Sequence, residues 1–568
     1  MSDSQVLLQL DKVSLSIHGT AVLHDISLQI AEGQTLGVIG ESGSGKSMTA
    51  LSIMQLMPRG SVLDGSIRFQ DKLLQELPEK SLCELRGSDI GMIFQEPMTA
   101  LNPLKTIGDQ VSESIRLHRQ VSRVDALQLT AQTLERVGLP NARFPLNRYP
   151  HELSGGQRQR VVIAIAVACK PRLLIADEPT TALDVTTQAG ILKLLKTLQQ
   201  EEGLALMLIT HDLAVVSNMA DDIVVMRQGR IVEQGALAEV FGDPGHEYTR
   251  TLFDASALTG ISRSAHLSSQ ASQASQASQA SQASQASQAS QALAPSASAS
   301  SGESGVPLLQ VRELVCEYPG RRKRLFGHAP AFRAVDEVSF DIRHGESVGL
   351  VGESGCGKST LTRALLGLMH LHSGRVELNG ESVSTLQQVS RVSRQQMQVV
   401  FQDPYGSFNP RHKVGRLVSE PLHVLDHPPG RAETRLRIAA VLESVGMLAT
   451  DSDKFIHEFS GGQRQRIAIA RSLIIKPSLI ILDEAVSALD VSVRAQVLQL
   501  LDDLAREQGL AYLFISHDLS VVQRVSDRVL IMRHGRIVER GNTSDVFDNP
   551  QHEYTQQLLA AAPKLTIA

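Results

Sequence analysis

Residues 40–47 read GESGSGKS, and residues 352–359 read GESGCGKS. Both copies fit the pattern G-x-x-x-x-G-K-[ST]. In this pattern glycines let backbone N–H groups converge on phosphate oxygens, the lysine neutralises charge, and the hydroxyl reaches a magnesium ion. The apolar residues Thr35–Gly40 predict a buried strand before the first copy, and the stretch after it, up to Met57, predicts a helix that begins at the phosphates. The second copy has the same flanks, SVGLVG and STLTRALLGLM.

The two copies therefore predict two phosphate-binding loops. The nucleotide-binding residues that they predict are Gly40, Glu41, Ser42, Gly43, Ser44, Gly45, Lys46, Ser47, Gly352, Glu353, Ser354, Gly355, Cys356, Gly357, Lys358 and Ser359.

The loops belong to a longer internal repeat. ELSGGQRQR (152–160) returns as EFSGGQRQR (458–466), and LLIADEPTTALD (173–184) returns as LIILDEAVSALD (479–490). Both pairs keep one offset, since 458 − 152 and 479 − 173 each give 306. A chain of 568 residues is too long for one ordinary core. Internal similarity at a fixed offset predicts one domain that has been duplicated.

A low-complexity tract separates the two halves. From Ser269 to Ala292 the triplet SQA recurs without a break. The tract lacks the large apolar residues that offset ordering entropy, which predicts a disordered linker, with a weak helix as the alternative. The predicted organisation is a first domain at 1–262, a linker at 263–306 and a second domain at 307–568.

Composition narrows the class of protein. The formal net charge of −5 gives no global basic field of the kind that nucleic-acid binders carry, so no nucleic-acid partner is expected. The four cysteines are scattered, which favours a reducing compartment over a disulfide framework or a metal cluster. The N-terminus shows no secretion signal, and no stretch approaches 18 consecutive apolar residues. We expect a cytosolic protein that does not itself span a membrane.

The strand ends of each repeat carry the groups for nucleotide hydrolysis. Asp177 and Glu178 follow an apolar strand, where Asp177 can hold magnesium through water and Glu178 can deprotonate the attacking water. His211 ends a later strand and can hydrogen-bond the γ-phosphate, and Gln95 follows another strand, where its amide can contact metal and water. The predicted catalytic residues of both halves are Glu178, His211, Glu484 and His517. The predicted metal-binding residues are Ser47, Gln95, Asp177, Ser359, Gln402 and Asp483.

The sequence SGGQ adds a second anion site to each repeat. Two glycines after a serine, before an apolar run, predict a helix N-terminus whose free N–H groups suit an anion. An ordinary helix cap is the alternative for a single copy, but the motif occurs twice in the same order. Its residues are Ser154, Gly155, Gly156, Gln157, Ser460, Gly461, Gly462 and Gln463.

The order of these motifs resembles the nucleotide-binding domains of ABC transporters over nearly everything except the linker. The resemblance implies an α/β fold with two P-loop NTPase domains, each with a helical subdomain, joined by a disordered linker. In that family two such domains pair head to tail, and each ATP lies between the phosphate loop of one and the SGGQ of the other. The resemblance therefore implies that the two halves pair with each other around ATP and Mg²⁺.

A finer resemblance is to the ATP-binding subunits of dipeptide, oligopeptide and nickel importers. It rests on EPMTALNP and DPYGSFNP after the glutamines, and on GDPGHEYTRTLF (Gly242–Phe253) and DNPQHEYTQQLL (Asp548–Leu559) near the domain ends. Fused members of this group serve peptide or microcin and glutathione import in bacteria. The resemblance implies two transmembrane permease subunits and a periplasmic substrate-binding protein as partners, at the cytoplasmic face of the inner membrane. A soluble tandem ABC ATPase acting on ribosomes or nucleic acid, or an exporter ATPase, is the alternative.

The chain departs from the family pattern in places. Members usually stack adenine on an aromatic residue before the phosphate loop; Tyr318 fits, whereas the first half offers Ile17 and His18, which predicts weaker nucleotide binding there. Cys356 lies within the second loop and is expected to be a tolerated small residue, with a thiolate favoured by Lys358 as the alternative. The basic segment Gly320–Gly327 is expected to be a solvated loop, with a lipid or membrane-partner contact as the alternative.

Overall fold

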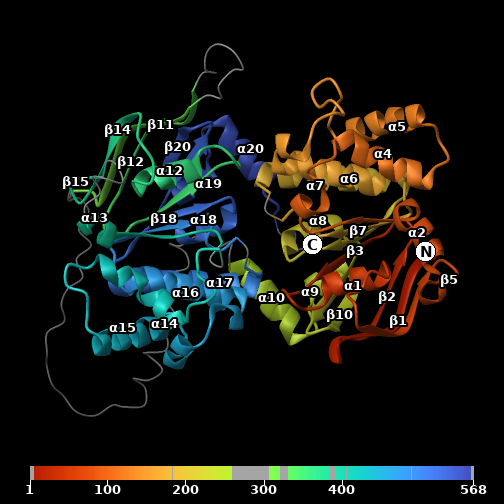
Figure 1. The fold of residues 1–568 in the computed structure, drawn as a ribbon, viewed down its shortest axis with the longest axis horizontal. Coiled ribbons are helices and arrows are strands. Elements are labelled where there is room, and N and C mark those ends of the chain that lie inside the picture. Colours follow the sequence, from red (N-terminus) through yellow and green to blue (C-terminus); the bar gives the residue numbers. More distant parts are fainter. Residues whose placement is uncertain are drawn as a thin grey trace. The chain divides into compact units, whose positions relative to one another are not determined.

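The computed structural model describes residues 5–181, 183–258, 306–319, 331–383, 391–403, 406–487 and 489–564. The chain forms two compact units, the first made chiefly of residues before Ala257 and the second chiefly of residues after it. Figure 1 shows that each unit combines sheets with covering helices. The SQA tract and the basic segment Gly320–Gly327 lie outside the described residues, so the linker and the domain limits stay predictions.

A mostly parallel sheet forms the centre of the first domain. Its strands lie in the order β10, β9, β3, β8, β7, β6, with β10 antiparallel to β9. The strands are β3 (Thr35–Ile39), β6 (Ile90–Ile93), β7 (Leu173–Asp177), β8 (Ala205–Ile209), β9 (Asp222–Arg227) and β10 (Arg230–Ala236). Because β3, β6, β7 and β8 run parallel, their carboxyl ends meet at one edge of the sheet, where ligands of open α/β sheets bind.

An antiparallel sheet and a set of helices cover the central sheet. The order of the antiparallel sheet is β2, β1, β4, β5. Its strands are β1 (Val6–Ile17), β2 (Thr20–Ala31), β4 (Ser61–Phe69) and β5 (Lys72–Leu73). The helices are α1 (Lys46–Ile53), α2 (Glu79–Ser88), α3 (Pro97–Ala100), α4 (Ile107–His118), α5 (Arg123–Arg136), α6 (Gly155–Val167), α7 (Val185–Glu202), α8 (Leu213–Met219), α9 (Leu237–Gly242) and α10 (Glu247–Leu258). In Figure 1, α4 and α5 lie together beside α6 and form the predicted helical subdomain.

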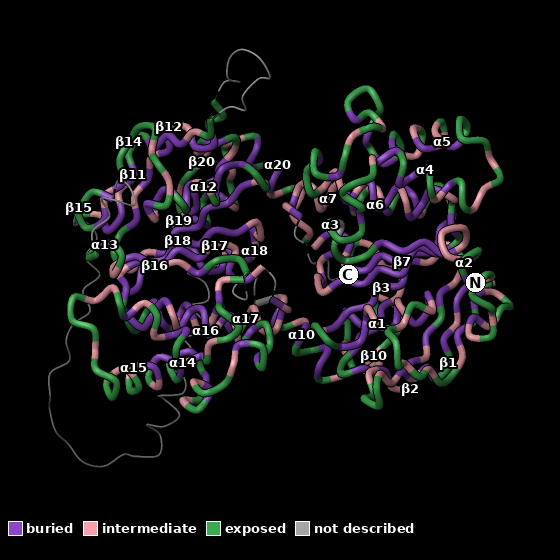
Figure 2. Tube along the Cα trace, in the orientation of Figure 1, coloured by how far each residue is buried: buried purple, intermediate pink, exposed green. Residues whose placement is uncertain are grey.

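The central sheet separates two apolar cores. Along β7, Leu173 and Ile175 pack with β1, β2 and α1, whereas Leu174 and Ala176 pack with α6 and the helical subdomain. This alternation follows from the two-residue period of a strand, and both faces are covered, so the first four residues of β7 are all apolar. Figure 2 shows the central strands buried, with exposed residues mainly in the outer elements.

The second domain repeats this plan. Its central sheet has the order β20, β19, β13, β18, β17, β16, and its antiparallel sheet has the order β12, β11, β14, β15. The strands are β11 (Leu309–Tyr318), β12 (Phe332–Ile342), β13 (Ser347–Val351), β14 (Ser373–Leu378), β15 (Glu381–Ser382), β16 (Met397–Val400), β17 (Leu479–Asp483), β18 (Ala511–Ser516), β19 (Arg528–Arg533) and β20 (Arg536–Asn542). The helices are α12 (Lys358–Leu365), α13 (Arg391–Gln396), α14 (Val414–Ser419), α15 (Arg431–Ser444), α16 (Gly461–Leu473), α17 (Val491–Gln508), α18 (Leu519–Val525), α19 (Thr543–Asp548) and α20 (Glu553–Ala561).

The helix predicted to run from the first phosphate loop to Met57 is shorter than expected. It is α1, which ends at Ile53. Gln55 adopts a positive φ of 51°, which an α-helix does not contain, and Pro58 follows. The residue before a proline is disfavoured in helical conformation, so apolar composition alone overestimates the length of the helix.

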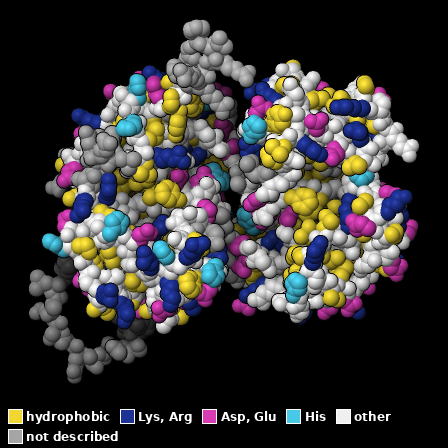
Figure 3. All heavy atoms as spheres, in the orientation of Figure 1, with side chains coloured by type: hydrophobic (Ala, Val, Ile, Leu, Met, Phe, Trp, Pro, Cys, Tyr) yellow, Lys and Arg dark blue, Asp and Glu magenta, His cyan; other side chains and the backbone are white. Residues whose placement is uncertain are grey.

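Two surface properties bear on function. On the face seen in Figure 3, acidic and basic side chains are intermingled rather than gathered by sign. None of the described helices combines the length and the apolar character needed to cross a bilayer.

Candidate active site

The first phosphate loop joins β3 to α1 at the ligand-binding edge of the sheet. A Cβ on Gly40 would lie 2.2 Å from the backbone oxygen of Met226, so only glycine fits where the loop leaves the strand. Lys46 begins α1 and is buried, and its Nζ donates to the backbone oxygens of Gly40, at 2.7 Å, and Glu41, at 2.8 Å. Burial lowers the pKa of Lys46. The ammonium group is therefore held over the loop, where it can meet a phosphate.

The second loop has the same geometry between β13 and α12. Lys358 Nζ donates to Gly352 O at 2.6 Å and to Glu353 O at 2.9 Å. Cys356 is buried, and burial raises the pKa of its thiol, with Lys358 acting in the opposite direction. Burial thus disfavours the thiolate and favours the interpretation of Cys356 as a tolerated small residue within the loop.

The predicted groups meet around Glu178 in the first domain. Gln95 Nε2 donates to Glu178 Oε2 at 2.9 Å, and Thr181 Oγ1 donates to the same oxygen at 2.8 Å. His211 Nδ1 lies 3.3 Å from Glu178 Oε1. The backbone of Glu178 has φ 47°, an uncommon conformation for a residue with a Cβ. The ends of β6, β7 and β8 thus place an amide, a carboxylate and an imidazole together.

The second domain repeats most of this cluster. Gln402 Nε2 donates to Glu484 Oε2 at 2.7 Å, and His517 Nδ1 lies 3.4 Å from Glu484 Oε1. Glu484 also has a positive φ, of 51°. The hydroxyl differs, because Ser487 Oγ donates to the backbone oxygen of Glu484 instead of its carboxylate, at 2.9 Å.

The adjacent carboxylates have opposite pKa shifts. Burial raises the pKa of Asp177, and a hydrogen bond from Ser47 opposes that shift. Burial also raises the pKa of Glu178, but its bonds to His211, Thr181 and Gln95 outweigh burial and lower the pKa to about 2. Glu178 is therefore a carboxylate at physiological pH, and its proton affinity is low while these donors surround it.

Asp177 fits a role as a ligand of a divalent cation. Its carboxylate is buried at the end of β7, and its Oδ1 has no hydrogen-bond partner among the described residues. Burial of a carboxylate oxygen without a hydrogen-bond partner costs free energy, and coordination of a cation can offset this cost. The neighbouring Ser47 hydroxyl and the Gln95 amide add oxygen donors, which is the set that Mg²⁺ prefers when nucleotide phosphates and water complete its shell.

The raised pKa of Asp483 is expected to make the stability of the second domain depend on pH, and unfolding experiments can measure this dependence. Burial raises its pKa from 3.8 to about 6, with repulsion from Glu484 in the same direction. The folded state thus holds this proton more tightly than the unfolded chain does, so stability is lost as pH rises from about 4 to about 6. We expect Asp483→Asn to stabilise the ligand-free second domain at pH 7.5 by about 1–2 kcal/mol, after allowance for partial solvation, and to flatten the pH dependence.

Denaturant unfolding of the ligand-free protein at pH 4.5 and 7.5 measures this effect. Asp503→Asn, on the solvent-exposed side of α17, is the control and should leave the pH profile unchanged. An Asp483→Asn protein that loses as much stability between these pH values as the unchanged chain would contradict the assignment.

The SGGQ turns begin α6 and α16, as predicted. Ser154 Oγ accepts from the N–H of Gln157 at 3.4 Å, and the Gln157 side chain accepts from the Ser154 N–H at 3.0 Å. Ser460 and Gln463 form the same reciprocal cap with the same distances. Among the described residues of the first domain, the hydrogen bonds of this turn are internal and none reaches the phosphate loop. The structure therefore groups the loop, Gln95, Asp177, Glu178 and His211 in one place and the SGGQ turn in another.

The two adenine-site candidates differ in geometry. Tyr318 ends β11 with 39% of its surface exposed, and its hydroxyl lies 3.3 Å from Thr360 Oγ1, near the start of α12. His18 instead forms the turn between β1 and β2, where its N–H donates to Gly60 O at 3.0 Å and its φ is 49°. An exposed ring beside the phosphate-loop helix is suited to stacking on adenine. Adenine stacking by Tyr318 and weaker nucleotide binding by the first domain both stay predictions.

Sequence reasoning missed two kinds of residue. One is Thr181, which donates to the carboxylate of Glu178, and the signal was its place three positions after Glu178. The other is the pair Tyr248 and Tyr554, whose hydroxyls contact the phosphate loops. Their motif, HEYT, was visible as a repeat, but its contact with the loop was not.

Comparison with known proteins assigns the family. A model described as "ABC transporter" matches residues 23–181 and 335–487, and one for the "Oligopeptide/dipeptide transporter, C-terminal region" matches residues 538–568. The glutathione import ATP-binding protein of Salmonella choleraesuis (strain SC-B67) is 46% identical over 574 residues, which cover 99% of this chain and 90% of the relative. The protein of the same name from Escherichia coli (strain K12) is 46% identical over 554 residues, 96% of this chain and 86% of the relative.

A solved structure from Clostridium perfringens, described as part of an ABC transporter complex, is 29% identical and covers 44% of this chain and 93% of its own, with a TM-score of 0.38. The two matches to the ABC transporter model and the near full-length similarity to its relatives agree with the duplicated motifs. The chain therefore belongs to the ABC transporter family, as an ATPase that carries two copies of the family's ATP-binding domain and, at residues 538–568, the oligopeptide and dipeptide transporter region.

Proposed function

We propose that this protein is the energy-coupling ATPase subunit of a bacterial importer for peptides or related small substrates, with glutathione as the first substrate to test. The observation that carries the proposal is the repetition of a complete hydrolytic cluster. Gln95, Glu178 and His211 recur as Gln402, Glu484 and His517 with matching hydrogen bonds. Near full-length similarity to glutathione import ATP-binding proteins supports the importer assignment over the exporter and ribosome-bound alternatives.

We propose that each ATP is bound by both domains. Within one domain the SGGQ turn makes no hydrogen bond with the phosphate loop among the described residues, although its free N–H groups suit an anion. Pairing of the two halves head to tail, as the family resemblance implies, gives each turn a phosphate to bind. One site then uses the loop at 40–47 with Ser460, Gly461, Gly462 and Gln463. The other uses the loop at 352–359 with Ser154, Gly155, Gly156 and Gln157.

In this proposal the carboxylates of each site have separate roles. Asp177 would hold Mg²⁺ at one site together with Ser47 and Gln95. Asp483 would hold it at the other site together with Ser359 and Gln402, and the ion would neutralise phosphate charge. Glu178 and Glu484 accept the proton of the attacking water. The donors around Glu178 lower its pKa to about 2, so we propose that they turn toward the nucleotide before Glu178 accepts the proton. Loss of the contacts from His211 and Gln95 on ATP binding would raise the proton affinity of Glu178.

The segments after the glutamines are proposed to contact the membrane partners. In Gln95–Leu117, the residues Leu104 and Leu117 are 85% and 75% exposed. Leu104 lies in the loop before α4, and Leu117 lies in the last turn of that helix. By the family resemblance, Gln95–Leu117 and Gln402–Leu422 transmit closure of the two domains to two transmembrane permease subunits. A periplasmic substrate-binding protein delivers the cargo, and the ATPase acts at the cytoplasmic face of the inner membrane.

Reconstituted transport tests this proposal. The tagged chain is isolated from native membranes, the proteins that accompany it are identified, and the complex is placed in proteoliposomes with ATP on the side of the ATPase. We expect ATP-dependent movement of radiolabelled glutathione or a dipeptide from the binding-protein side to the ATPase side. Movement in the opposite direction would assign an exporter, and isolation with ribosomes instead of membrane proteins would contradict the proposal.

A further inference from the structure

The sequence HEYT lies near the end of both domains and has no assigned role in hydrolysis. Its two copies span 246–249 and 552–555. Each copy begins the last described helix of its domain, α10 or α20. The second copy lies within the region 538–568 that marks oligopeptide and dipeptide transporters.

In the first domain the tyrosine of this motif contacts the phosphate loop. Tyr248 Oη accepts a hydrogen bond from the backbone N–H of Glu41, the second residue of the loop, at 3.2 Å. A residue has one backbone N–H, so the Glu41 amide bonds to the tyrosine and not to phosphate. Only 6% of Tyr248 is exposed, and burial raises its pKa to about 12, so it stays a neutral phenol. The tyrosine oxygen thus accepts the hydrogen of a partly buried loop amide.

The second domain makes the same contact independently. Tyr554 Oη accepts from the backbone N–H of Glu353 at 3.1 Å, and only 1% of Tyr554 is exposed. An arginine covers each ring at 4.7 Å from its centroid, Arg227 over Tyr248 and Arg533 over Tyr554. These arginines end β9 and β19, next to Met226 and Met532, whose backbone oxygens closely approach the loop glycines. The tyrosine and the strand end therefore support the loop together.

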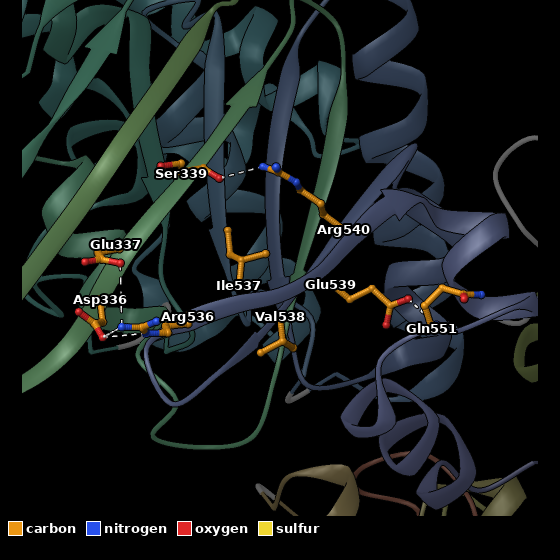
Figure 4. Close-up of a pocket in the computed structure, with 9 residues that line it drawn as sticks. All are labelled: Asp336, Glu337, Ser339, Arg536, Ile537, Val538, Glu539, Arg540 and Gln551. Atoms are coloured by element: carbon orange, nitrogen blue, oxygen red, sulfur yellow. Dashed lines mark hydrogen bonds and ion pairs between the residues drawn. The ribbon is translucent and has the colours of Figure 1, made fainter.

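A clamp fixes the position of each tyrosine. In the second domain, Glu539 on β20 accepts from the backbone N–H groups of Gln551, at 2.7 Å, and His552, at 3.1 Å. His552 Nδ1 accepts from the N–H of Tyr554 at 3.0 Å, as a helix cap does. Figure 4 shows Glu539 extended toward Gln551, and both residues line a cavity of about 530 Å³.

The first domain has the same clamp. Glu233 accepts from the N–H groups of Gly245 and His246 at 2.7 and 3.1 Å, and His246 Nδ1 accepts from the N–H of Tyr248 at 3.0 Å. In both domains a strand glutamate thus orders the helix start, the histidine orders the tyrosine, and the tyrosine orders the phosphate loop.

We propose that Tyr248 and Tyr554 are positioning residues of the two nucleotide sites, each of which holds the phosphate loop of its own domain in the conformation that presents its remaining N–H groups to phosphate. The proposal rests on the proposed function only in requiring that the loops bind ATP. It gives the transporter-specific C-terminal region a direct role in the ATP site. Loss of the tyrosine contact is expected to weaken ATP binding. A loop in the wrong conformation binds the ground state and the transition state less tightly by the same amount.

The test compares the unchanged chain with Tyr248→Phe/Tyr554→Phe, which removes only the two hydroxyls. We expect the affinity for a fluorescent ATP analogue to fall about 3- to 10-fold at each site, the range for one hydrogen bond to a buried amide. KM for ATP should rise by the same factor while kcat changes less than about twofold. The matched control is Thr543→Val, which removes a buried hydroxyl that donates to Ser526 O at 2.8 Å away from the loop. The control should keep the nucleotide affinity of the unchanged chain.

A second pair of variants tests the clamp without touching the tyrosine. His552→Ala removes the acceptor for the Tyr554 N–H and should weaken ATP binding at one of the two sites, whereas His552→Asn supplies another cap oxygen and should restore it. Phenylalanine variants that bind ATP as the unchanged chain does would overturn the proposal and leave the ATPase assignment intact. An unchanged chain that binds no ATP would overturn the proposed function as well.

Discussion

A chain that carries Glu178→Gln and Glu484→Gln is expected to bind ATP but to hydrolyse it at least about 100-fold more slowly than the unchanged protein, the usual contribution of general-base catalysis. Glutamine keeps the shape of the side chain and can still accept from Gln95 and Gln402, but it cannot take the proton of water. Both sites must be changed, because each domain holds a complete cluster around its own glutamate.

Phosphate release and equilibrium binding of ATP measure the two parts of this prediction. The control is Glu433→Gln, an exposed residue of α15 whose carboxylate pairs with Arg437. The control should retain full turnover. A double variant that keeps more than about a tenth of the original rate would show that another group accepts the proton, since loss of a general base removes at least two orders of magnitude.

Gly155→Asp combined with Gly461→Asp is expected to lower the rate of ATP hydrolysis by about 100-fold or more, while each domain stays folded. A Cβ on Gly461 meets nothing within 4 Å, and one on Gly155 meets only Leu183 at 3.7 Å, so each domain has room for a side chain. An acidic residue in the first turn even favours the helix. A carboxylate placed against the phosphates of an ATP held by the other domain repels them, and like charges in an interface cost several kcal/mol.

This variant distinguishes ATP sites that both domains form together, as proposed, from ATP sites that one domain forms by itself. Its matched control is Gly155→Ala combined with Gly461→Ala, which adds a methyl group without charge and should retain most turnover. Gly156 and Gly462 are unsuitable, because a Cβ there would lie 2.2 Å from Thr187 or Val493 of the same domain. Full activity of the aspartate variant, with its melting temperature unchanged, would contradict the proposed pairing of the two halves around ATP.

Local sequence patterns predicted the skeleton of each site. An apolar strand before a glycine-rich loop needs only its own residues to be recognised, because loop geometry and helix start are set within about ten residues. The same holds for the two carboxylates after β7, for the SGGQ cap of α6, and for the polar residues after β6 and β8. These elements occur where the patterns placed them.

Local patterns are incomplete where the environment outweighs them. The backbone amides and Lys358 around Cys356 left a thiolate as the alternative to a tolerated small residue, but burial has the larger effect and raises the pKa of the thiol. The predicted extension of α1 to Met57 failed because the backbone at Gln55 leaves the helical region before Pro58. In both cases the surroundings of the residue, and not its type, decided the outcome.

By itself, the sequence determined that this protein contains two copies of one nucleotide-hydrolysing domain, because repeats, loops and strand-end carboxylates are written in contiguous residues. Only the tertiary structure decided that Tyr248 and Tyr554 support the phosphate loops, from positions 207 and 201 residues away from Glu41 and Glu353. The tertiary structure also places Gln95 and His211 in contact with the carboxylate of Glu178. Such contacts join residues far apart in the chain, and they exist only once burial has brought those segments together.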